Sequence, residues 1–316
     1  RVWAGTDDGF VHVTSDGVLL VAEAGKGGTD CSTGVCVGLT GSVTAVRNPS
    51  RADGAAPNRI VTNLLSVSRM DHTFALGPSG VSMRHYRNGT MSIQQNSYDP
   101  AAVPPAWRGT LARLLSATPR STATVVANIS AFEAAHDPDH QGVDSNPNAV
   151  LDLGDHKLVA DAGGNSIVWV SNDGRMRLFH VFPNVRTPGC AEPAPPSGFP
   201  PNPYDPWPGY DPTPQFPGCN FVPTSLAMKG DGDILVGGLV SERQGMGQVV
   251  ELDGRTGALE HSWGGLTAVT GVAAGRDGSI YASELWAPGR TFPNREIPGI
   301  DDVGVVTRIA RDGTRS

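Results

Sequence analysis

The fold is decided by the stretch Ser15-Asp16-Gly17-Val18-Leu19-Leu20-Val21-Ala22-Glu23, because its pattern recurs along the chain. An Asp-Gly dipeptide is followed by a run of β-branched and apolar residues, and the same order is found in 230–236 and in 276–284. Asp-Gly favours a tight turn because glycine adopts positive φ without steric cost, and the apolar run favours a strand. The repeat therefore predicts an all-β protein with short turns.

The spacing of the copies predicts the architecture. Val236 and Tyr281 occupy equivalent places 45 residues apart, and four-stranded propeller blades repeat after about 40 to 50 residues. Five such units can be counted, and a sixth is expected to be shared between the chain ends, with 306–309 pairing near 2–13. A shared blade closes the ring and removes exposed strand edges. We therefore expect one six-bladed β-propeller domain over residues 1–316, with seven blades as the alternative.

One helix is expected to interrupt the repeat. In residues 125–135, the apolar residues Val126, Ile129 and Phe132 recur on one helical face. The polar residues 136–140 that follow are expected to form a turn, because Pro138 breaks the face that joint metal ligation would need.

A proline-rich insertion covers residues 187–219, where proline is too dense for a strand. Its aromatic residues are candidate binding residues, namely Tyr204, Trp207 and Tyr210. The insertion is predicted to be either a lid or partner-binding surface, or a disordered decoration held at its base by a disulfide.

The cysteines indicate an extracytoplasmic protein. They fall in two local pairs, Cys31 with Cys36 and Cys190 with Cys219. Neither pair forms a CxxC motif or has a histidine cluster beside it, so two disulfides are favoured over a zinc site. Asn88 and Asn128 begin sequons and are candidate glycosylation sites. We therefore predict a secreted or extracellular glycoprotein, or a periplasmic or cell-surface protein in a bacterium.

Charge and hydropathy exclude two classes of partner. The formal net charge is −7, with 24 Lys and Arg against 31 Asp and Glu, and no basic run is present. A nucleic-acid groove is therefore not expected. No apolar run is long enough to span a bilayer, so no membrane span is predicted. The chain begins at Arg1, which we interpret as a cleaved leader or a start inside a longer precursor.

Six stretches of the chain form a specific series of motifs. Two of them are Asp144-Ser145-Asn146-Pro147-Asn148 and Leu158-Val159-Ala160-Asp161-Ala162-Gly163-Gly164-Asn165, and the other four lie at 20–28, 38–44, 128–133 and 222–225. In order and approximate spacing these stretches resemble the ScyD/ScyE family of propellers, and the first two are the most specific. The resemblance spans residues 18 to 285 and implies a six-bladed propeller, broadly of the NHL/SMP-30 kind, with an export signal. It implies no settled activity.

Acidic residues recur at the end of the second strand of the repeat unit. Because inner strand ends converge on the channel of a propeller, these acids and one amide form a candidate metal site: Glu23, Asn146, Asp161, Glu242 and Glu284. An oxygen-only ligand set suits Ca²⁺. In the alternative interpretation, each acid accepts hydrogen bonds from neighbouring backbone amides and no metal is bound.

Two functions follow from this reading. The favoured one is a binding or scaffold module for a protein, glycan or small-molecule partner, with Asn165 and Thr224 as further candidate binding residues, because no complete catalytic constellation can be named. The alternative is a Ca²⁺-dependent lactonase or esterase-like hydrolase, in which the channel ion polarises an ester carbonyl and His72 is the candidate catalytic residue. The two differ in whether the candidate metal ligands approach one point.

Overall fold

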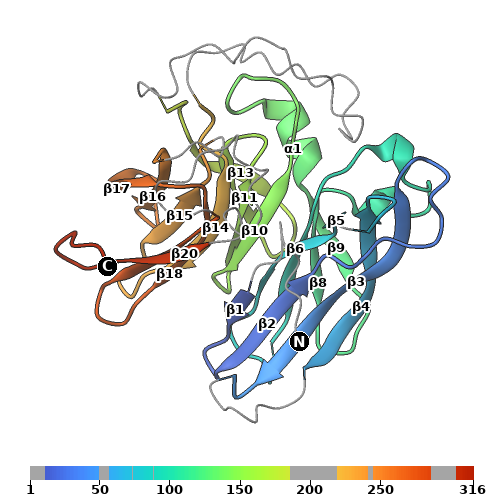
Figure 1. The fold of residues 1–316 in the computed structure, drawn as a ribbon, viewed down its shortest axis with the longest axis horizontal. Coiled ribbons are helices and arrows are strands. Elements are labelled where there is room, and N and C mark those ends of the chain that lie inside the picture. The colour runs from blue at the N-terminus through green and yellow to red at the C-terminus, as the bar shows by residue number, and fades with distance from the viewer. Residues whose placement is uncertain are drawn as a thin grey trace.

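The computed structural model describes residues 11–49, 57–72, 74–87, 89–185, 219–240, 245–285 and 304–316. Within these residues, five antiparallel sheets follow one another along the chain, and each is built from strands that are consecutive in sequence (Figure 1). The sheets pack in chain order, with β2 against β6, β6 against β10, β10 against β14, and β14 against β18. The described residues therefore form a β-propeller, as predicted.

The first two sheets contain nine strands and two short 3-10 helices. The first sheet consists of β1 (Val11–Val13), β2 (Val18–Glu23), β3 (Cys36–Arg47), β4 (Asn58–Ser68) and β5 (Ala75–Leu76). The second consists of β6 (Pro78–Ser82), β7 (Met91–Gln95), β8 (Arg113–Ala117) and β9 (Thr124–Asn128), with η1 (Pro100–Ala102) and η2 (Arg108–Thr110) between β7 and β8.

The helix α1 (Ile129–His136) connects the second sheet to the remaining three. The third sheet consists of β10 (Pro147–Asp152), β11 (His156–Asp161), β12 (Ser166–Ser171) and β13 (Met176–Val181). The fourth consists of β14 (Pro223–Met228), β15 (Ile234–Gly238), β16 (Gly247–Leu252) and β17 (Leu259–Leu266). The fifth consists of β18 (Val269–Ala274), β19 (Ile280–Glu284) and β20 (Val305–Ile309).

The prediction of six blades is wrong for the described part of the chain, which forms five sheets. The strand β20 belongs to the fifth sheet through its pairing with β19, and β1 belongs to the first sheet through its pairing with β2. The other edge of β20 is occupied because Arg308 and Ser316 exchange two backbone hydrogen bonds of 2.8 and 3.0 Å. Residues 2–10, which were expected to contribute to the shared blade, lie outside the described residues.

The predicted Asp-Gly turns are confirmed. Gly17, Gly232 and Gly278 adopt φ of 80°, 101° and 80°, and each donates its amide to the carbonyl three residues earlier. All three turns join the first strand of a sheet to the second. Glycine is favoured at these places because other residues are strained at such φ.

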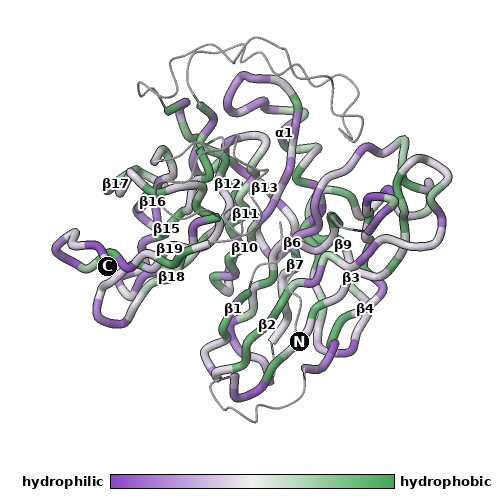
Figure 2. Tube along the Cα trace, viewed as in Figure 1, coloured by the Kyte–Doolittle hydropathy of each residue, from purple (hydrophilic) through white to green (hydrophobic). Residues whose placement is uncertain are grey.

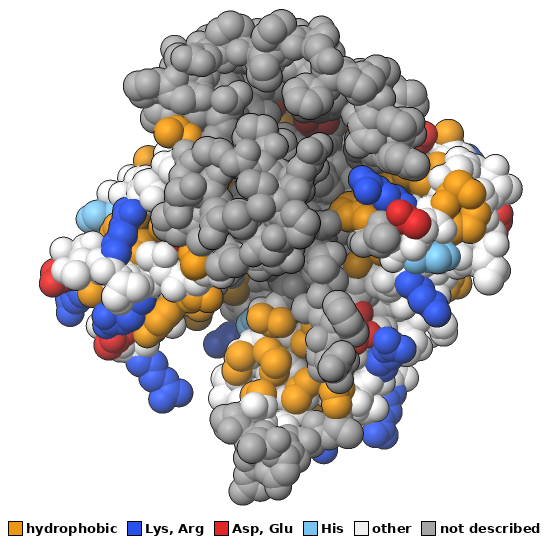
Figure 3. Space-filling view, viewed as in Figure 1, with side chains coloured by type: hydrophobic (Ala, Val, Ile, Leu, Met, Phe, Trp, Pro, Cys, Tyr) orange, Lys and Arg blue, Asp and Glu red, His pale blue; other side chains and the backbone are white. Residues whose placement is uncertain are grey.

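The core lies between successive sheets, and Figure 2 shows apolar residues along the strands with polar residues mostly in the outer turns. Leu20 and Ile93 bury their side chains between the first and second sheets, and Ile167 and Ile234 do so between the third and fourth. Exposed apolar side chains occur as well, and they gather over the lower part of the molecule where β1 and β2 lie (Figure 3).

The predicted helix begins later than expected. Residues 124–128 form β9, because this β-branched run pairs with β8. Asn128 then caps α1, since its side-chain oxygen accepts a hydrogen bond of 3.0 Å from the amide of Ala131. Its glycosylation stays a prediction, and Asn88 lies outside the described residues.

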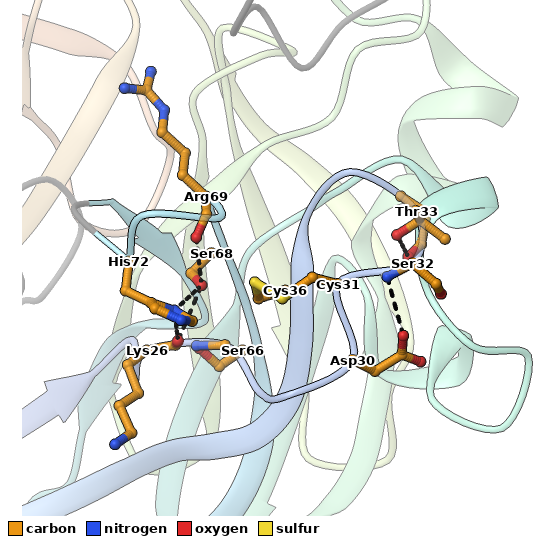
Figure 4. Close-up of a disulfide and its surroundings, with 12 residues drawn as sticks. Lys26, Asp30, Cys31, Ser32, Thr33, Cys36, Ser66, Ser68, Arg69 and His72 are labelled. Atoms are coloured by element: carbon orange, nitrogen blue, oxygen red, sulfur yellow. Dashed lines mark hydrogen bonds between the residues drawn. A yellow bond between two sulfur atoms is a disulfide. The ribbon is translucent and has the colours of Figure 1, made fainter.

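The predicted disulfide between Cys31 and Cys36 is present, with the two Cα atoms 4.0 Å apart (Figure 4). Cys219 also takes part in a disulfide, but its predicted partner Cys190 lies outside the described residues, as does most of the proline-rich insertion with Tyr204, Trp207 and Tyr210. Among the described helices, none is long and apolar enough to cross a membrane.

Candidate functional site

Three of the four predicted channel acids lie at equivalent places. Glu23, Asp161 and Glu284 end the second strands β2, β11 and β19 of their sheets. The fourth, Glu242, lies outside the described residues. The prediction that these three acids end the second strand of the repeat unit is therefore confirmed.

Glu23 binds donors within its own sheet, and Glu284 binds one donor in its own sheet and one in the connection between β17 and β18. The carboxylate of Glu23 accepts hydrogen bonds from Ser42, from Thr44 Oγ1 at 3.0 Å and from Arg59 Nε at 2.8 Å. The carboxylate of Glu284 accepts from the Thr267 amide at 2.6 Å and from Thr307 Oγ1 at 2.5 Å. Such contacts satisfy carboxylates without a metal.

No described group of three or more potential metal ligands includes these channel acids; all such groups lie in the fourth sheet. The channel metal site therefore stays a prediction, as does its Ca²⁺.

Asp161 is satisfied by the segment that precedes β10. Its two carboxylate oxygens accept hydrogen bonds of 2.7 Å from Ser145 Oγ and from the amide of Asn146. Asp161 is only 1% exposed, and burial raises the pKa of its carboxyl group against these hydrogen bonds. Asn146 and Asp161, which were predicted together, are therefore neighbours, and Asp161 holds the start of β10 in place.

Two further acids lie beside Asp161, and we call Glu133, Asp144 and Asp161 the α1 carboxyl cluster. Glu133, on α1, is 2% exposed. Its Oε1 accepts a hydrogen bond of 3.0 Å from the Asp144 amide, and its Oε2 has no hydrogen-bond donor. Asp144 lies on an exposed loop, but its carboxyl group is hydrogen-bonded to that of Glu133.

The acids of the α1 carboxyl cluster resist ionisation. Burial, followed by the charge of Asp161, raises the pKa of Glu133 to about 8. Burial of its carboxyl group also raises the pKa of Asp144 to about 6, although the hydrogen bond with Glu133 lowers it. At neutral pH the pair therefore shares a proton, which Glu133 donates to Asp144.

The predicted binding residues Asn165 and Thr224 are buried and connect neighbouring sheets. Asn165 donates to Asp139 Oδ2 at 2.7 Å and accepts from the Val222 amide at 2.9 Å. Thr224 Oγ1 lies 2.8 Å from the carbonyl of Val269 in the next sheet. These contacts position the sheets relative to one another, and a role in ligand binding stays a prediction.

The candidate catalytic residue His72 lies on an exposed turn after β4. Its Nδ1 lies 3.0 Å from Ser68 Oγ and 2.9 Å from the Lys26 carbonyl, and these contacts tie the turn to the segment after β2 (Figure 4). Its catalytic role stays a prediction.

One cavity is a groove of about 560 Å³ between β4 and the region before β9, which we call the β4–β9 groove. Its apolar walls include Leu39, Trp107 and Val125, and two arginines, Arg59 and Arg120, also line it. A second cavity of about 430 Å³ lies between α1 and β13, with Phe132 and Leu178 in its walls.

Sequence reasoning missed both Glu133 and the β4–β9 groove. Glu133 follows Ile129 by four residues and therefore lies on the apolar face of the helix, where a charged residue is a signal of a special role. The groove joins side chains from β3, β4, η2 and β9, and no local pattern links these segments.

The comparisons with known proteins establish no family. No protein-family model matches the chain, and no curated protein matches its sequence. The predicted membership of the ScyD/ScyE family therefore stays a prediction.

Among solved structures, the chain is similar to a gluconolactonase from Xanthomonas campestris, with 9% identity, a TM-score of 0.49, and coverage of 99% of this chain and 76% of that one. A streptogramin B lyase has 11% identity, a TM-score of 0.45, and coverage of 100% and 84%. Virginiamycin B lyase from Staphylococcus aureus has 10% identity, a TM-score of 0.44, and coverage of 98% and 69%. Similarities at this level carry no conclusion about activity.

Proposed function

We propose that this protein is a binding propeller that holds an extended segment of a partner protein in the β4–β9 groove. The observation that carries the proposal is an edge of β4 beside an apolar wall that no described strand covers in full. Along its inner edge β4 pairs with β3, whereas on its outer edge, among the residues that the structure describes, β5 pairs with Val67 and Ser68 alone. A strand edge with unpaired backbone groups is a template for one more strand.

On the outer edge of β4, described residues contact the backbone carbonyls of two β4 residues, Ile60 and Leu65. The Ile60 carbonyl accepts from the Arg120 amide at 2.6 Å, and the Leu65 carbonyl accepts from Gln95 Nε2 at 3.2 Å. Between these contacts, Thr62 and Asn63 are exposed. A bound strand of a few residues would therefore pair in this interval.

Side chains around this edge favour apolar residues in the partner. Leu39 is 39% exposed and Val125 is 51% exposed, and Trp107 is half-buried beside them. Alternate side chains of a bound strand point to the same side, so every second residue of the partner would contact this wall. Aromatic residues in such grooves contribute strongly to binding.

The charge of the groove favours an acidic group at one end of the partner segment. Arg59 forms an ion pair of 2.8 Å with Glu23, but Arg120 is exposed and forms no ion pair with a described residue. We therefore expect an Asp, a Glu or a free C-terminal carboxylate of the partner to lie at Arg120.

The test uses fluorescein-labelled octapeptides that alternate Val, Ile or Leu with polar residues and end in Asp. Their binding to the protein is measured by fluorescence anisotropy. Trp107→Ala is expected to lower the affinity of the protein for the tightest-binding peptide at least tenfold, which corresponds to about 1.4 kcal/mol of binding free energy. Arg120→Glu is expected to remove the preference for a terminal Asp over a terminal Lys. Leu178→Ala, in the second cavity, is the matched control and leaves binding unchanged. The proposal is wrong if no peptide binds at millimolar concentration. It is also wrong if the protein binds a glycan on an array and the groove variants abolish that binding.

The Ca²⁺-dependent hydrolase remains the alternative function. It needs the predicted channel acids to share an ion, whereas the described ones each accept hydrogen bonds from nearby protein donors. Hydrolysis of a lactone and ester panel, with and without a chelator, is the measurement that would favour it.

A further inference from the structure

The α1 carboxyl cluster contains a buried oxygen without a donor. Glu133 points from α1 into the protein together with Ile129 and Phe132, and only 2% of it is exposed. One of its oxygens, Oε2, has no hydrogen-bond donor. The Glu133 carboxyl group lies instead against the carboxyl group of Asp144, and two carboxyl groups in contact need either a shared proton or a cation between them.

No positive side chain compensates the cluster. None of the ion pairs among the described residues involves Glu133, Asp144 or Asp161. The nearby charges that act on the cluster are instead further acids, Asp137 and Asp139. A buried set of like charges is stabilised by a cation.

We propose that Glu133 and Asp144 bind a hard divalent cation, with Ca²⁺ as the expected ion. The site is separate from the β4–β9 groove and does not depend on the function proposed for that groove. Glu133 Oε2 supplies the buried ligand, and the carboxylate of Asp144 supplies the second. Because Asp144 lies on an exposed loop, water molecules complete the coordination shell, as they commonly do around Ca²⁺ and Mg²⁺.

The donor atoms select the class of metal. Both side-chain ligands are carboxylates, and the cluster contains no sulfur or imidazole ligand, so the site favours Ca²⁺ or Mg²⁺ over Zn²⁺. Ca²⁺ is expected to bind more tightly than Mg²⁺, because two carboxylates on separate elements do not impose the strict octahedral geometry that Mg²⁺ requires.

Asp161 is a positioning residue in this site. Its oxygens are already engaged by Ser145 and by the Asn146 amide, so it fixes the segment that carries Asp144. Gly163 allows this segment to approach, because a Cβ at that position would lie 1.9 Å from the Asp144 carbonyl oxygen. The backbone around Asp144 is therefore held in place before any ion binds.

A second acidic group is the competing location for an ion. Asp231, Asp233 and Glu251 bring their carboxylates within reach of one another, and we call them the Lys229 cluster because Lys229 Nζ lies 2.9 Å from Asp231 Oδ2 and also contacts Glu251. The ammonium group of Lys229 already occupies the place of a cation. The Lys229 cluster therefore serves as the matched control.

The test is calorimetric titration of the chelator-treated full chain with CaCl₂, and separately with MgCl₂, at pH 7.5. We expect saturable binding of one Ca²⁺ per chain, with a dissociation constant on the order of 10⁻⁵ to 10⁻³ M. Glu133→Gln and Asp144→Asn are each expected to weaken binding at least about tenfold. Asp231→Asn is expected to leave the affinity unchanged.

Terbium luminescence gives a second measurement if Glu133→Gln fails to fold, because Asp144→Asn keeps the size of the native side chain and lies on the loop before β10 rather than in the helix. A terbium signal that Ca²⁺ displaces in the wild type and that Asp144→Asn abolishes supports the site. The proposal is overturned if the wild type binds no ion saturably, or if binding survives both Glu133→Gln and Asp144→Asn, whatever the effect of Asp231→Asn.

Discussion

The α1 carboxyl cluster and the Lys229 cluster contain three acids each, yet the two regions behave in opposite ways. In the Lys229 cluster, partial burial lowers the pKa of Lys229, but hydrogen bonds with Glu251 and Asp231 raise it overall, and the hydrogen bond from Lys229 lowers the pKa of Asp231. In the α1 carboxyl cluster, burial without a countercharge raises the pKa of Glu133 to about 8. The presence of a positive partner, rather than the number of acids, therefore decides whether such a group is ionised.

The largest expected effect is the pH dependence that Glu133 imposes on stability. Unfolded Glu133 loses its proton near its ordinary pKa of 4.5, whereas folded Glu133 keeps it until about pH 8. Between these values the folded state binds more protons, so the free energy of unfolding falls as pH rises, by up to about 5 kcal/mol. In Glu133→Gln this decline is expected to flatten, as measured by urea unfolding between pH 4.5 and 8.5 in the presence of EDTA.

The control for this experiment is Glu251→Gln, which changes a buried acid that has a positive partner. It should leave the decline between pH 4.5 and 8.5 in place. A Glu133→Gln profile that runs parallel to the wild type would mean that Glu133 is ionised in the folded protein and that the two clusters do not differ.

A smaller effect is expected from the hydrogen bonds that Asp161 accepts. Asp161→Ala leaves the buried Ser145 Oγ and the Asn146 amide without their acceptor, and we expect a loss of about 3 kcal/mol in the free energy of unfolding. Asp231→Ala, on the exposed side of the Lys229 cluster, should cost less than about 1 kcal/mol. Equal losses in chemical denaturation would contradict the view that Asp161 holds the start of β10.

The smallest effect concerns Lys229 itself. Lys229→Gln removes the positive partner of Glu251, whose side chain is 6% exposed, and we expect a loss of about 1 to 2 kcal/mol at low ionic strength. The thermal stability of the variant should also come to depend on Ca²⁺, because the three carboxylates of the Lys229 cluster lose their positive partner. Thermal unfolding with CaCl₂ and with an equal ionic strength of NaCl separates ion binding from screening; identical curves in both salts would refute the expectation.

The sequence predicts the local parts of the fold well, because these depend on neighbouring residues. The turns at Gly17, Gly232 and Gly278 follow from the conformational freedom of glycine, and the acids Glu23, Asp161 and Glu284 lie at the predicted strand ends. The number of sheets was missed because strand pairing is a long-range property. The assignment of 306–309 to a sixth blade depended on a partner strand that the local pattern could not identify.

The candidate sites were harder to predict for the same reason. The spacing of Val126, Ile129 and Phe132 predicted a helix in the region of α1, but neither the burial of Glu133 nor its contact with Asp144 is visible without the packing of α1 on the third sheet. The β4–β9 groove depends on how far β5 extends along β4. Side-chain burial and edge exposure are set by tertiary structure, and a local motif does not report them.

The construction of each described sheet from consecutive strands has a consequence for how the protein is made. Short loops close with little loss of chain entropy, so a sheet can form as soon as its own segment has left the ribosome. Its apolar face is buried only against the next sheet, however, since the hydrophobic clusters lie between successive sheets. During synthesis, each newly formed sheet therefore exposes an apolar surface until the next sheet has been synthesised. A pause in translation between two blades would leave this surface exposed for longer and favour aggregation of the nascent chain.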